Sequence, residues 1–539
     1  MNLSRLFSLL CKDTISQGRV QTPVLKMIAD RRLEIAAFVP QDYWLVQGSF
    51  QADSGHFPGT HFLPEEYKDS KHWKIEEAQA VLDLCSGHPG QALSVHKKAG
   101  KQKAPLPFDL TTLQRECNRK FGFSAQTTLG IAQGLYEKRT IITYPRTDSR
   151  YLSTEVFSEI DKNLTAIQGI YPDLVDNVLG LVRHVGSFAC VNDAKVTDHH
   201  AIIPTQTPPN PKVLSLQEKQ VFDLIARRFM AAFMPPLEYE ATTIWVEVKG
   251  ERFKATGRIL KNKGWLEAEP WRKAQNNPLP DMRKGEWVQI LNLEVVAKKT
   301  TPPAEYTDES LLGIMETAGK EVTDPQLRAA LKDKGLGTPA TRAQIIETLI
   351  QRGYVQRVNK KLVATDKGLE VARISEELIP QVVSPQMTGE WEQKLGDIAR
   401  GRAEYTQFKS DISRFVSDIV TATRDKTIRY NAPLARNSGP ASKEVIGTCP
   451  LCGGDVLETK KSFGCANWRS TGCRFALWKT SFGGRIGKRA ARQLLQTGKT
   501  KQELKLQSKA GKAYTARLSL DEKGVLKPVF TKEDTTRKT

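Results

Sequence analysis

The stretch from Thr140 to Leu152 constrains this chain more than any other part of it. It reads TIITYPRTDSRYL, in which residues 141–143 favour a β-strand. Pro145 should end that strand, because proline has no N–H to donate to a neighbouring strand. Tyr144 is therefore expected at a strand end. The polar loop that follows it contains Arg146, Asp148 and Arg150.

The chemistry of this stretch admits two interpretations. A phenol has a pKa of about 10, so it is a poor nucleophile at neutral pH unless cations stabilise its anion. Arg146 and Arg150 are permanent cations with forked donors that suit a phosphodiester. Tyr144 is either a nucleophile that attacks a nucleic-acid phosphate, or an aromatic residue beside a solvated charge cluster.

Length and charge favour a large, multidomain protein with a polyanionic partner. The 539 residues suffice for about three to five domains. Lys plus Arg number 80 and Asp plus Glu number 60, a net charge of +20. The segment from Cys449 to Thr539 holds 20 of the basic residues and 7 of the acidic ones. This basic segment is either a solubilising surface or a nucleic-acid-binding region.

The sequence contains no sign of a membrane span or of a disulfide framework. No apolar run reaches the ~18 residues that a membrane-spanning helix needs. The first residues lack the features of a secretion signal, and their apolar residues fall at helical spacing, which predicts an amphipathic helix. Four scattered cysteines are expected to be buried thiols of a reducing compartment. These are Cys11, Cys85, Cys117 and Cys190.

Residues 1–38 are expected to be helical. Thr22 can cap a helix whose first position is Pro23. Arg19 and Gln21 precede that helix start, where backbone N–H groups favour a phosphate. Arg19 is otherwise an ordinary exposed side chain beside a capped helix.

Strands and helices are expected to alternate in blocks up to residue 296. Residues 43–92 read as strands and loops, and Gly100–Pro107 reads as a linker. Strands within residues 237–296 should join the earlier ones in a single domain. Helices are expected at 108–123, from Ser124 onward, and at 215–234.

Residues 335–363 predict a helix followed by a β-hairpin, which is a winged-helix pattern. Thr338 is the N-cap, Pro339 the first helical residue, and Asn359-Lys360 the hairpin turn. Thr338, Thr341 and Arg342 could hold a DNA phosphate at the start of the helix, or the unit could serve packing only. Helices should continue to about residue 424.

A cysteine cluster follows the polar segment 425–446, which reads as a linker. Four thiolates spaced in this way suit a tetrahedral zinc ion in a small ribbon. The candidate ligands are Cys449, Cys452, Cys465 and Cys473. Aromatic residues interleaved with them belong to a core or stack on bases. These are Phe463, Trp468, Phe475, Trp478 and Phe482.

The stretch ITYPRTDSRYLS resembles the active-site segment of type IA DNA topoisomerases, in the form seen in topoisomerase III. Further stretches are similar to the same family and occur in the family's order. They are SQGRVQTPVL (Ser16–Leu25), DHHAIIPT (Asp198–Thr205), GLGTPATRAQIIETLIQRGYV (Gly335–Val355) and the cysteine cluster with its basic tail.

The resemblance implies a multidomain α+β ring with winged-helix-like helical domains, a β-rich arch and a zinc-ribbon-like tail. Residues 1–42 and 303–424 would form the helical cleft domain. Residues 43–106 and 213–302 would form the arch, and residues 107–212 the catalytic tyrosine domain. Residues 425–446 would be the linker, and residues 447–539 a basic DNA-binding region.

The resemblance also implies a reaction. Tyr144 would attack a single-stranded DNA phosphate to give a 5′-phosphotyrosine, and religation would need no ATP. Arg146 and His199 would be catalytic, whereas His200 would be a structural hydrogen-bonding residue. DNA would contact Arg19, Gln21, Asp148, Arg150, Thr338, Thr341 and Arg342. Such an enzyme would work in the bacterial cytosol or nucleoid.

The sequence departs from the family in one respect. Family members begin with a metal-binding (Toprim) domain that carries an Asp-x-Asp-x-Glu cluster for Mg²⁺, and Asp-x-Asp does not occur in this sequence. The chain is therefore expected to be a truncated or fragmentary relative, a topoisomerase that a separate Toprim-type polypeptide completes, or a non-catalytic remnant or subunit that binds single-stranded DNA. A winged-helix transcription factor is a further interpretation.

Overall fold

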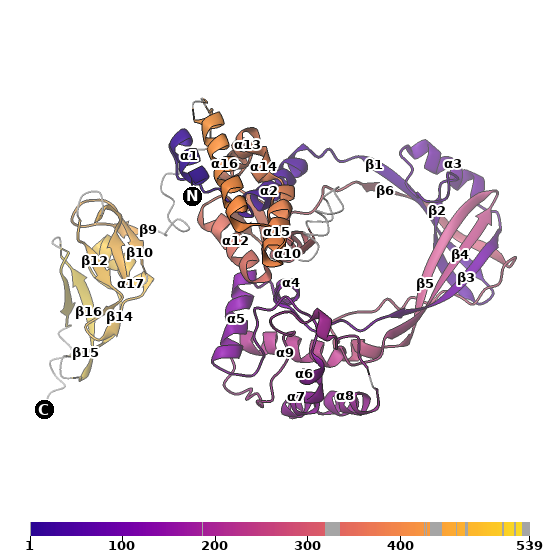
Figure 1. Ribbon diagram of the computed structural model, residues 1–539, viewed down its shortest axis with the longest axis horizontal. Coiled ribbons are helices and arrows are strands. Elements are labelled where there is room, and N and C mark those ends of the chain that lie inside the picture. The colour runs from indigo at the N-terminus through magenta and orange to yellow at the C-terminus, as the bar shows by residue number, and fades with distance from the viewer. Residues whose placement is uncertain are drawn as a thin grey trace. The chain divides into compact units, whose positions relative to one another are not determined.

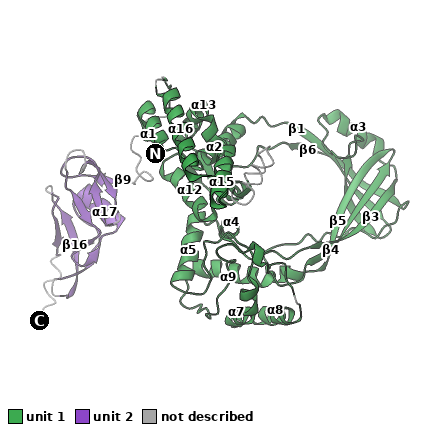
Figure 2. Ribbon diagram, in the orientation of Figure 1, with its two compact units in different colours: residues 1–433 green, residues 434–539 purple. Residues whose placement is uncertain are grey.

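The computed structural model of the chain consists of two units, residues 1–433 and residues 434–539 (Figure 2). It describes residues 2–185, 187–317, 335–424, 426, 428–431, 445–459, 461–468, 473–508, 511–521 and 524–530. Most of the expected linker at 425–446 lies outside these ranges.

The N-terminal helices are present, but the second begins earlier than expected. Helix α1 spans Asn2–Cys11 and buries Phe7, and α2 spans Gln21–Ala37. Thr22 is not the N-cap. Its hydroxyl donates to the Gln17 side chain at 2.8 Å and accepts the N–H of Gly18 at 3.0 Å, so it organises the preceding loop instead. Pro23 is tolerated inside the first turn because N–H groups there have no helical acceptor.

The strands on either side of the tyrosine region join in a single sheet, as expected, and this sheet closes into a barrel. Its strand order is β1-β2-β5-β4-β3-β6, with β6 returning to β1. Closure leaves no free sheet edge, and Phe50, Phe57 and Phe253 fill the interior. The strands are β1 (Asp42–Ala52), β2 (Gly55–Phe62), β3 (Gly90–Gln102), β4 (Leu237–Val248), β5 (Glu251–Asn262) and β6 (Trp287–Lys299).

One helix of the barrel region was not predicted from the sequence. Helix α3 spans Ile75–Cys85, where only strands and loops were expected. It buries Ala78, Val81 and Cys85 against the barrel. Their spacing of three and four residues is the helical signal. Strand β3 also runs three residues into the expected linker at 100–107.

The region that carries Tyr144 has its own core. Helix α4 (Leu110–Phe121) is capped by Asp109, and α5 (Ala125–Glu137) is capped by Ser124. Helix α9 (Leu216–Ala231) was assigned to the arch from the sequence, and that assignment is wrong. Its buried face shares a core with Ile142 and contacts α5. The region is completed by α6 (Thr154–Ser158), α7 (Ile160–Ile167) and α8 (Pro172–His184).

The second helical region contains the expected helix and hairpin. Helix α12 (Pro339–Gln351) has Thr338 as its N-cap, and the hairpin turn places Asn359 and Lys360 at φ 48° and 69°. These elements share a core with α1 and α2. The remaining elements are α10 (Asp308–Thr317), β7 (Val355–Val358), β8 (Lys361–Ala364), α13 (Asp366–Leu378), α14 (Pro380–Val383), α15 (Pro385–Ala399) and α16 (Tyr405–Thr423).

The chain of the first unit forms a closed circuit (Figure 1). Strands β1 and β6 join the barrel to the helical region, and β3 and β4 join it to the tyrosine region. The circuit closes where α10 and α12 contact α4 and α5. Asp308, which is 1% exposed, accepts the Ala125 N–H at 3.1 Å. Its carboxylate also accepts from Nη2 of Arg357 at 2.9 Å and from Nε of Arg357 at 3.1 Å.

The second unit is a small β-rich body with a separate core. Four strands form the sheet β12-β11-β10-β9, and three more form the sheet β15-β16-β17. Phe463 and Phe475 are buried in its core, whereas Trp478 and Phe482 are exposed. The bounds are β9 (Val445–Thr448), β10 (Asp455–Glu458), β11 (Ser462–Cys465), β12 (Ala476–Trp478), β13 (Thr480–Ser481), β14 (Gly484–Arg485), α17 (Lys488–Thr497), β15 (Leu504–Gln507), β16 (Ala513–Leu520) and β17 (Leu526–Val529).

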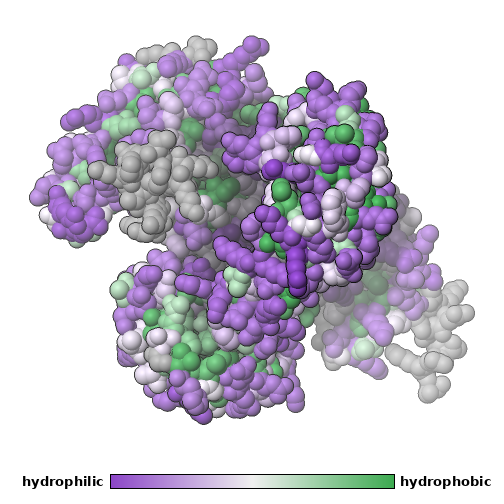
Figure 3. Space-filling view, turned by 90° about the vertical axis from the view of Figure 1, so that its right-hand side faces the viewer, coloured by the Kyte–Doolittle hydropathy of each residue, from purple (hydrophilic) through white to green (hydrophobic). Residues whose placement is uncertain are grey.

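The surface in view in Figure 3 is mostly hydrophilic, with hydrophobic residues in separate small patches. Among the described residues, no helix combines the length and the apolar character that crossing a membrane requires. Cys11, Cys85, Cys117 and Cys190 are all buried free thiols, as the sequence predicts.

Helix α13 packs so closely on the hairpin that it requires glycine at position 368. A Cβ at Gly368 would lie 2.0 Å from the carbonyl oxygen of Tyr354. The Tyr354 hydroxyl in turn accepts the N–H of Ser16 at 2.8 Å, so this contact ties the N-terminal segment to the hairpin. We expect Gly368→Ala to lower the free energy of unfolding by roughly 1–3 kcal/mol, measured as a fall in the thermal midpoint.

Gly130→Ala is the matched control. Gly130 is also inside a helix, but a Cβ there meets nothing within 4 Å. Alanine favours a helix over glycine by roughly 0.5–1 kcal/mol, so this variant should be as stable as the parent or slightly more so. Equal midpoints for the two variants would contradict the packing argument.

Candidate active site and metal centre

Tyr144 ends an extended segment that lies beside residues 202–204. The expected strand at 141–143 is not formed. Instead, the segment pairs with residues 202–204 through an isolated β-bridge between Ile142 and Pro204. Beside this bridge, the Thr143 N–H donates to the Ile203 carbonyl at 2.9 Å. Pro204 has no N–H with which to continue a ladder. The phenol ring is half-buried against Tyr136, with ring centroids 5.5 Å apart.

His199 lies directly beside the candidate nucleophile. Its ring centroid is 4.5 Å from that of Tyr144, and its side chain is exposed. His200 turns away, with Nδ1 2.8 Å from the carbonyl of Ala201, and burial lowers the pKa of His200. Only the first of the two adjacent histidines can therefore reach a ligand of Tyr144.

Buried hydroxyl groups fix the tyrosine loop to the histidine segment. The Thr147 hydroxyl donates to the His199 carbonyl at 2.8 Å and accepts the Ser149 N–H at 3.0 Å. The Ser149 hydroxyl donates to the Lys195 carbonyl at 3.0 Å. Thr147 and Ser149 were not predicted from the sequence as positioning residues. The alternation of hydroxyl residues at 147 and 149 with charged residues at 146, 148 and 150 was the available signal.

A cavity of about 210 Å³ lies between this loop and the start of α12. Within the described ranges, the guanidinium of Arg146 has no hydrogen-bond or ion-pair partner, so it can face an anion. Asp148 accepts the Thr197 hydroxyl at 2.5 Å. The N-terminus of a 13-residue helix adds partial positive charge on the opposite wall. The cavity is lined by Arg146, Thr147, Asp148, Thr197, Asp198, His199, Thr338, Pro339 and Ala340.

Two of the predicted arginine contacts do not line this cavity. Arg150 donates to the backbone carbonyl of Pro107 at 3.3 Å. Arg342 was expected to project from the start of α12, but it is 3% exposed. It donates to the Thr111 hydroxyl at 2.9 Å and to the Gly337 carbonyl at 3.0 Å, and burial lowers the pKa of Arg342. Arg342 therefore holds α12 against α4.

Of the two predicted N-terminal contacts, Arg19 and Gln21, only Arg19 lies at another cavity. Arg19 lines a space of about 360 Å³ beside Trp391 and forms an ion pair with Glu392 at 2.7 Å. The Gln21 amide donates to the Ser16 carbonyl at 3.0 Å. Thr338 and Thr341 are exposed at the N-terminus of α12, and their hydroxyl oxygens lie 3.0 Å apart.

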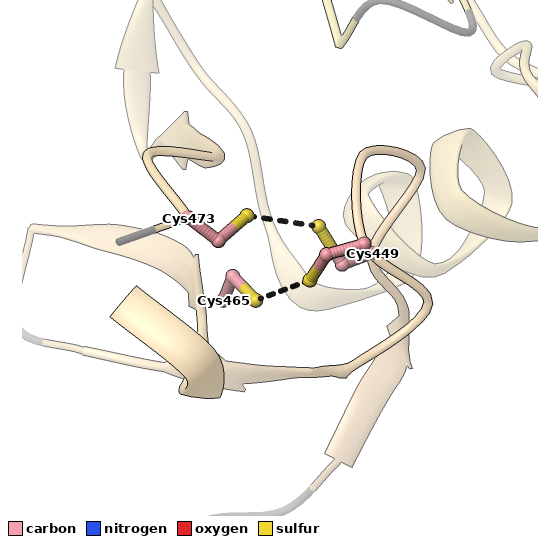
Figure 4. Close-up of side chains that lie close together, drawn as sticks. Cys449, Cys465 and Cys473 are labelled. Atoms are coloured by element: carbon pink, nitrogen blue, oxygen red, sulfur yellow. Dashed lines mark hydrogen bonds between the residues drawn. The ribbon is translucent and has the colours of Figure 1, made fainter. Parts of the chain in front are cut away.

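The four clustered cysteines converge in the second unit (Figure 4). All four sulfur atoms lie within 4.8 Å of one another, which is compatible with ligands around a single metal ion. Cys449 approaches Cys473 at 3.7 Å, and Cys452 approaches Cys465 at 3.4 Å. The backbone N–H of Gly454 lowers the pKa of Cys452 to about 7, which favours the thiolate that a metal binds.

Comparisons with known proteins show which proteins this chain is similar to. A family profile described as DNA topoisomerase matches residues 1–410, and one described as C-terminal repeat of topoisomerase matches residues 472–531. DNA topoisomerase 3 from Bacillus subtilis is 33% identical over 473 residues, which cover 85% of this chain and 62% of that protein. DNA topoisomerase 3 from Bacillus licheniformis is 34% identical over 474 residues, with the same coverage.

A solved structure is also similar. Full-length topoisomerase I from Thermotoga maritima superposes with a TM-score of 0.62 at 27% identity, covering 79% of this chain and 66% of that one. The chain spans 62% of the length of the curated relatives above. Because the family profile covers more than half of the residues, and includes the tyrosine loop and the winged helix, the chain belongs to the type IA DNA topoisomerase family.

Proposed function

We propose that this chain changes DNA topology as its family does, by cutting one DNA strand through Tyr144, letting another strand pass and resealing the break. Relaxation and decatenation would both follow from this cycle. One observation carries the proposal. The ring of Tyr144 contacts that of His199 beside a cavity in which Arg146 has no protein partner among the described residues.

The reaction is a transesterification in both directions. The phenol oxygen of Tyr144 attacks phosphorus, its proton leaves, and the bond to the 3′ oxygen breaks as that oxygen takes up a proton. The product is a 5′-phosphotyrosine and a free 3′ hydroxyl. One phosphodiester replaces another, so resealing needs no ATP. The 3′ hydroxyl then attacks the phosphotyrosine and restores the strand.

The residues around Tyr144 have distinct tasks in this cycle. The guanidinium of Arg146 stabilises the negative charge that builds up on the phosphate oxygens. His199 binds the phosphate or assists proton transfer at the phenol. Asp148 fixes the loop through Thr197. Thr338 and Thr341 present hydroxyls at the start of α12 where a neighbouring phosphate would lie.

Single-stranded DNA would be the substrate, as the remaining contacts suggest. Arg19 would exchange its partner Glu392 for a phosphate, and Gln21 supports the same loop. In the second unit, Trp478 and Phe482 are 57% and 38% exposed, which leaves both rings accessible to a base. Base stacking on exposed aromatic rings among cations favours single strands over duplexes.

Resealing in the family is expected to use Mg²⁺, and the described residues of this chain offer no matching site. Within the described ranges, the cysteine cluster is the one group of three or more metal-ligating side chains, so no carboxylate set there fits Mg²⁺. No step of the proposed reaction is assigned to that ion. A separate Toprim-type polypeptide would supply the carboxylates.

The same observation favours a second candidate function. We infer, as the alternative, that the chain acts as a non-catalytic subunit that binds single-stranded DNA. A winged-helix transcription factor gains no support, because α12 faces the tyrosine cavity. The two surviving candidates differ in whether a covalent bond to Tyr144 forms.

The covalent intermediate gives a direct test. The purified chain is incubated with Mg²⁺ and a single-stranded oligonucleotide, and then denatured. If Tyr144 attacks, a label at the 3′ end of the oligonucleotide should remain on the protein in a denaturing gel. A label at the 5′ end should appear only on a shorter free fragment. Tyr144→Phe should reduce the protein-bound label to background, because phenylalanine has no hydroxyl.

Tyr151→Phe is the matched control, since Tyr151 lies in the same loop and its hydroxyl accepts from Lys195 at 3.3 Å. It should keep the adduct. Tight DNA binding without any adduct would support the non-catalytic subunit, and an adduct that survives in Tyr144→Phe would exclude this tyrosine as the nucleophile.

We further propose that the four cysteines hold one zinc ion. A structural zinc site couples metal binding to folding. Elemental analysis should find one zinc per chain, and a strong chelator should lower the unfolding midpoint of the second unit. Cys452→Ser should lose the metal, whereas Cys85→Ala, a buried thiol of the barrel, should retain it. Equal zinc content in both variants would contradict the assignment.

A further inference from the structure

A second polar cavity lies close to the tyrosine loop but is separate from the catalytic one. Its volume is about 120 Å³, and neither Tyr144, Arg146 nor His199 lines it. Its walls come from α4, α9, α10 and the loop after Tyr144. The charged side chains around it are Arg115, Arg119, Arg150, Arg228, Glu116 and Glu309.

Arg228 is the unusual member of this set. Its side chain is only 5% exposed, and its guanidinium packs 4.2 Å from the ring centroid of Phe108. Nε donates to Glu269, but Nη2 is buried without a hydrogen-bond partner. Nη2 lies 3.9 Å from the carboxylate of Glu116. A buried cationic donor without a partner is costly, so it calls for an acceptor.

The two carboxylates at the cavity are already neutralised by other arginines. Glu116 accepts from Arg272 at 2.8 Å and from Arg119. Glu309 accepts from Arg115 at 3.1 Å. Arg228 has a carboxylate partner of its own, Glu269, which Nε binds, but its Nη2 has no hydrogen-bond acceptor. Among the described residues, the guanidinium of Arg150 pairs with no carboxylate.

Arg150 is the second arginine at the cavity whose guanidinium makes only weak contacts. Its Nε and Nη2 reach only backbone carbonyls, those of Pro107 at 3.3 Å and Leu106 at 3.5 Å, which are long contacts. Desolvation lowers the pKa of Arg228, as expected for a guanidinium that is not fully compensated. Forked guanidinium donors from two segments are the usual protein ligands of a tetrahedral oxyanion.

We propose that this cavity binds one phosphate group, held by Arg150 and Arg228. Its volume is well below the roughly 300–1,000 Å³ of sites for whole small molecules, so it suits a single phosphate rather than a complete nucleotide. The phosphate could belong to the backbone of a DNA strand or be free in solution. The site does not require Tyr144 to cleave DNA.

The first arm of the test uses orthophosphate with the full-length chain. Binding is measured by titration calorimetry and by the rise in the unfolding midpoint, against chloride at equal ionic strength. Arg228→Lys keeps the charge but removes the forked donors, so it should weaken phosphate binding by about tenfold or more. Arg150→Lys should do the same, and it serves if Arg228→Lys does not fold.

Arg227→Lys is the matched control. Arg227 is the neighbouring residue of α9, but it pairs with Asp223 at 2.8 Å and does not line the cavity. It should bind phosphate as the parent does. Phosphate binding that is equally strong in all variants would place the anion elsewhere and overturn the proposal.

The second arm identifies the source of the phosphate. Binding of a single-stranded oligonucleotide is measured for the parent, Arg228→Lys and Arg227→Lys. If a DNA phosphate occupies the cavity, Arg228→Lys alone should bind DNA more weakly, and saturating oligonucleotide should block orthophosphate. If the ligand is free phosphate, orthophosphate should bind equally well with DNA present. Absence of phosphate binding together with equal DNA affinities would overturn the proposal, whether or not the chain forms a covalent adduct.

Discussion

The contact between α4 and α5 on one side and α10 and α12 on the other is the interaction on which the candidate active site depends. The tyrosine loop supplies Arg146 and the histidine segment supplies His199 to one wall of the cavity, and the start of α12 supplies Thr338 to the other. Neither wall alone encloses a phosphate. The site therefore exists only while the circuit of the first unit is closed.

Hydrogen bonds of buried charged groups, and not a shared apolar core, hold the two sides of this contact together. Asp308 joins Ala125 and Arg357 through charged hydrogen bonds, and Arg342 joins α12 to α4 in a similar way. Water can replace hydrogen bonds of this kind when the contact opens. The large apolar residues belong to separate cores on the two sides, so separation would leave those cores intact. The proposed strand passage would require this contact to open while the two cores stay folded.

Local signals in the sequence predicted much of this architecture. Apolar periodicity located α4 and α9, caps located α5 and the helix–hairpin unit, and cysteine spacing located the cysteine cluster. Errors arose where tertiary packing decides the outcome. The sequence of α12 marks Arg342 as a first-turn cation but does not show that α4 covers it. Helix α9 precedes barrel strands in the sequence, yet its apolar face fits the tyrosine core. The roles of Thr147 and Ser149 depend on a segment about 50 residues away that local patterns do not reveal.

A distance measurement across the seam tests this account most directly. Genetically encoded spin labels at Gln126 on α5 and Gln344 on α12 occupy exposed positions on contacting helices. The account predicts one short distance for the protein alone, and an additional longer distance when circular single-stranded DNA is added. The longer population should grow in Asp308→Ala, which removes the carboxylate that accepts the Ala125 N–H across the contact. A single short distance under all these conditions would contradict the claim that the site is assembled by a contact that opens.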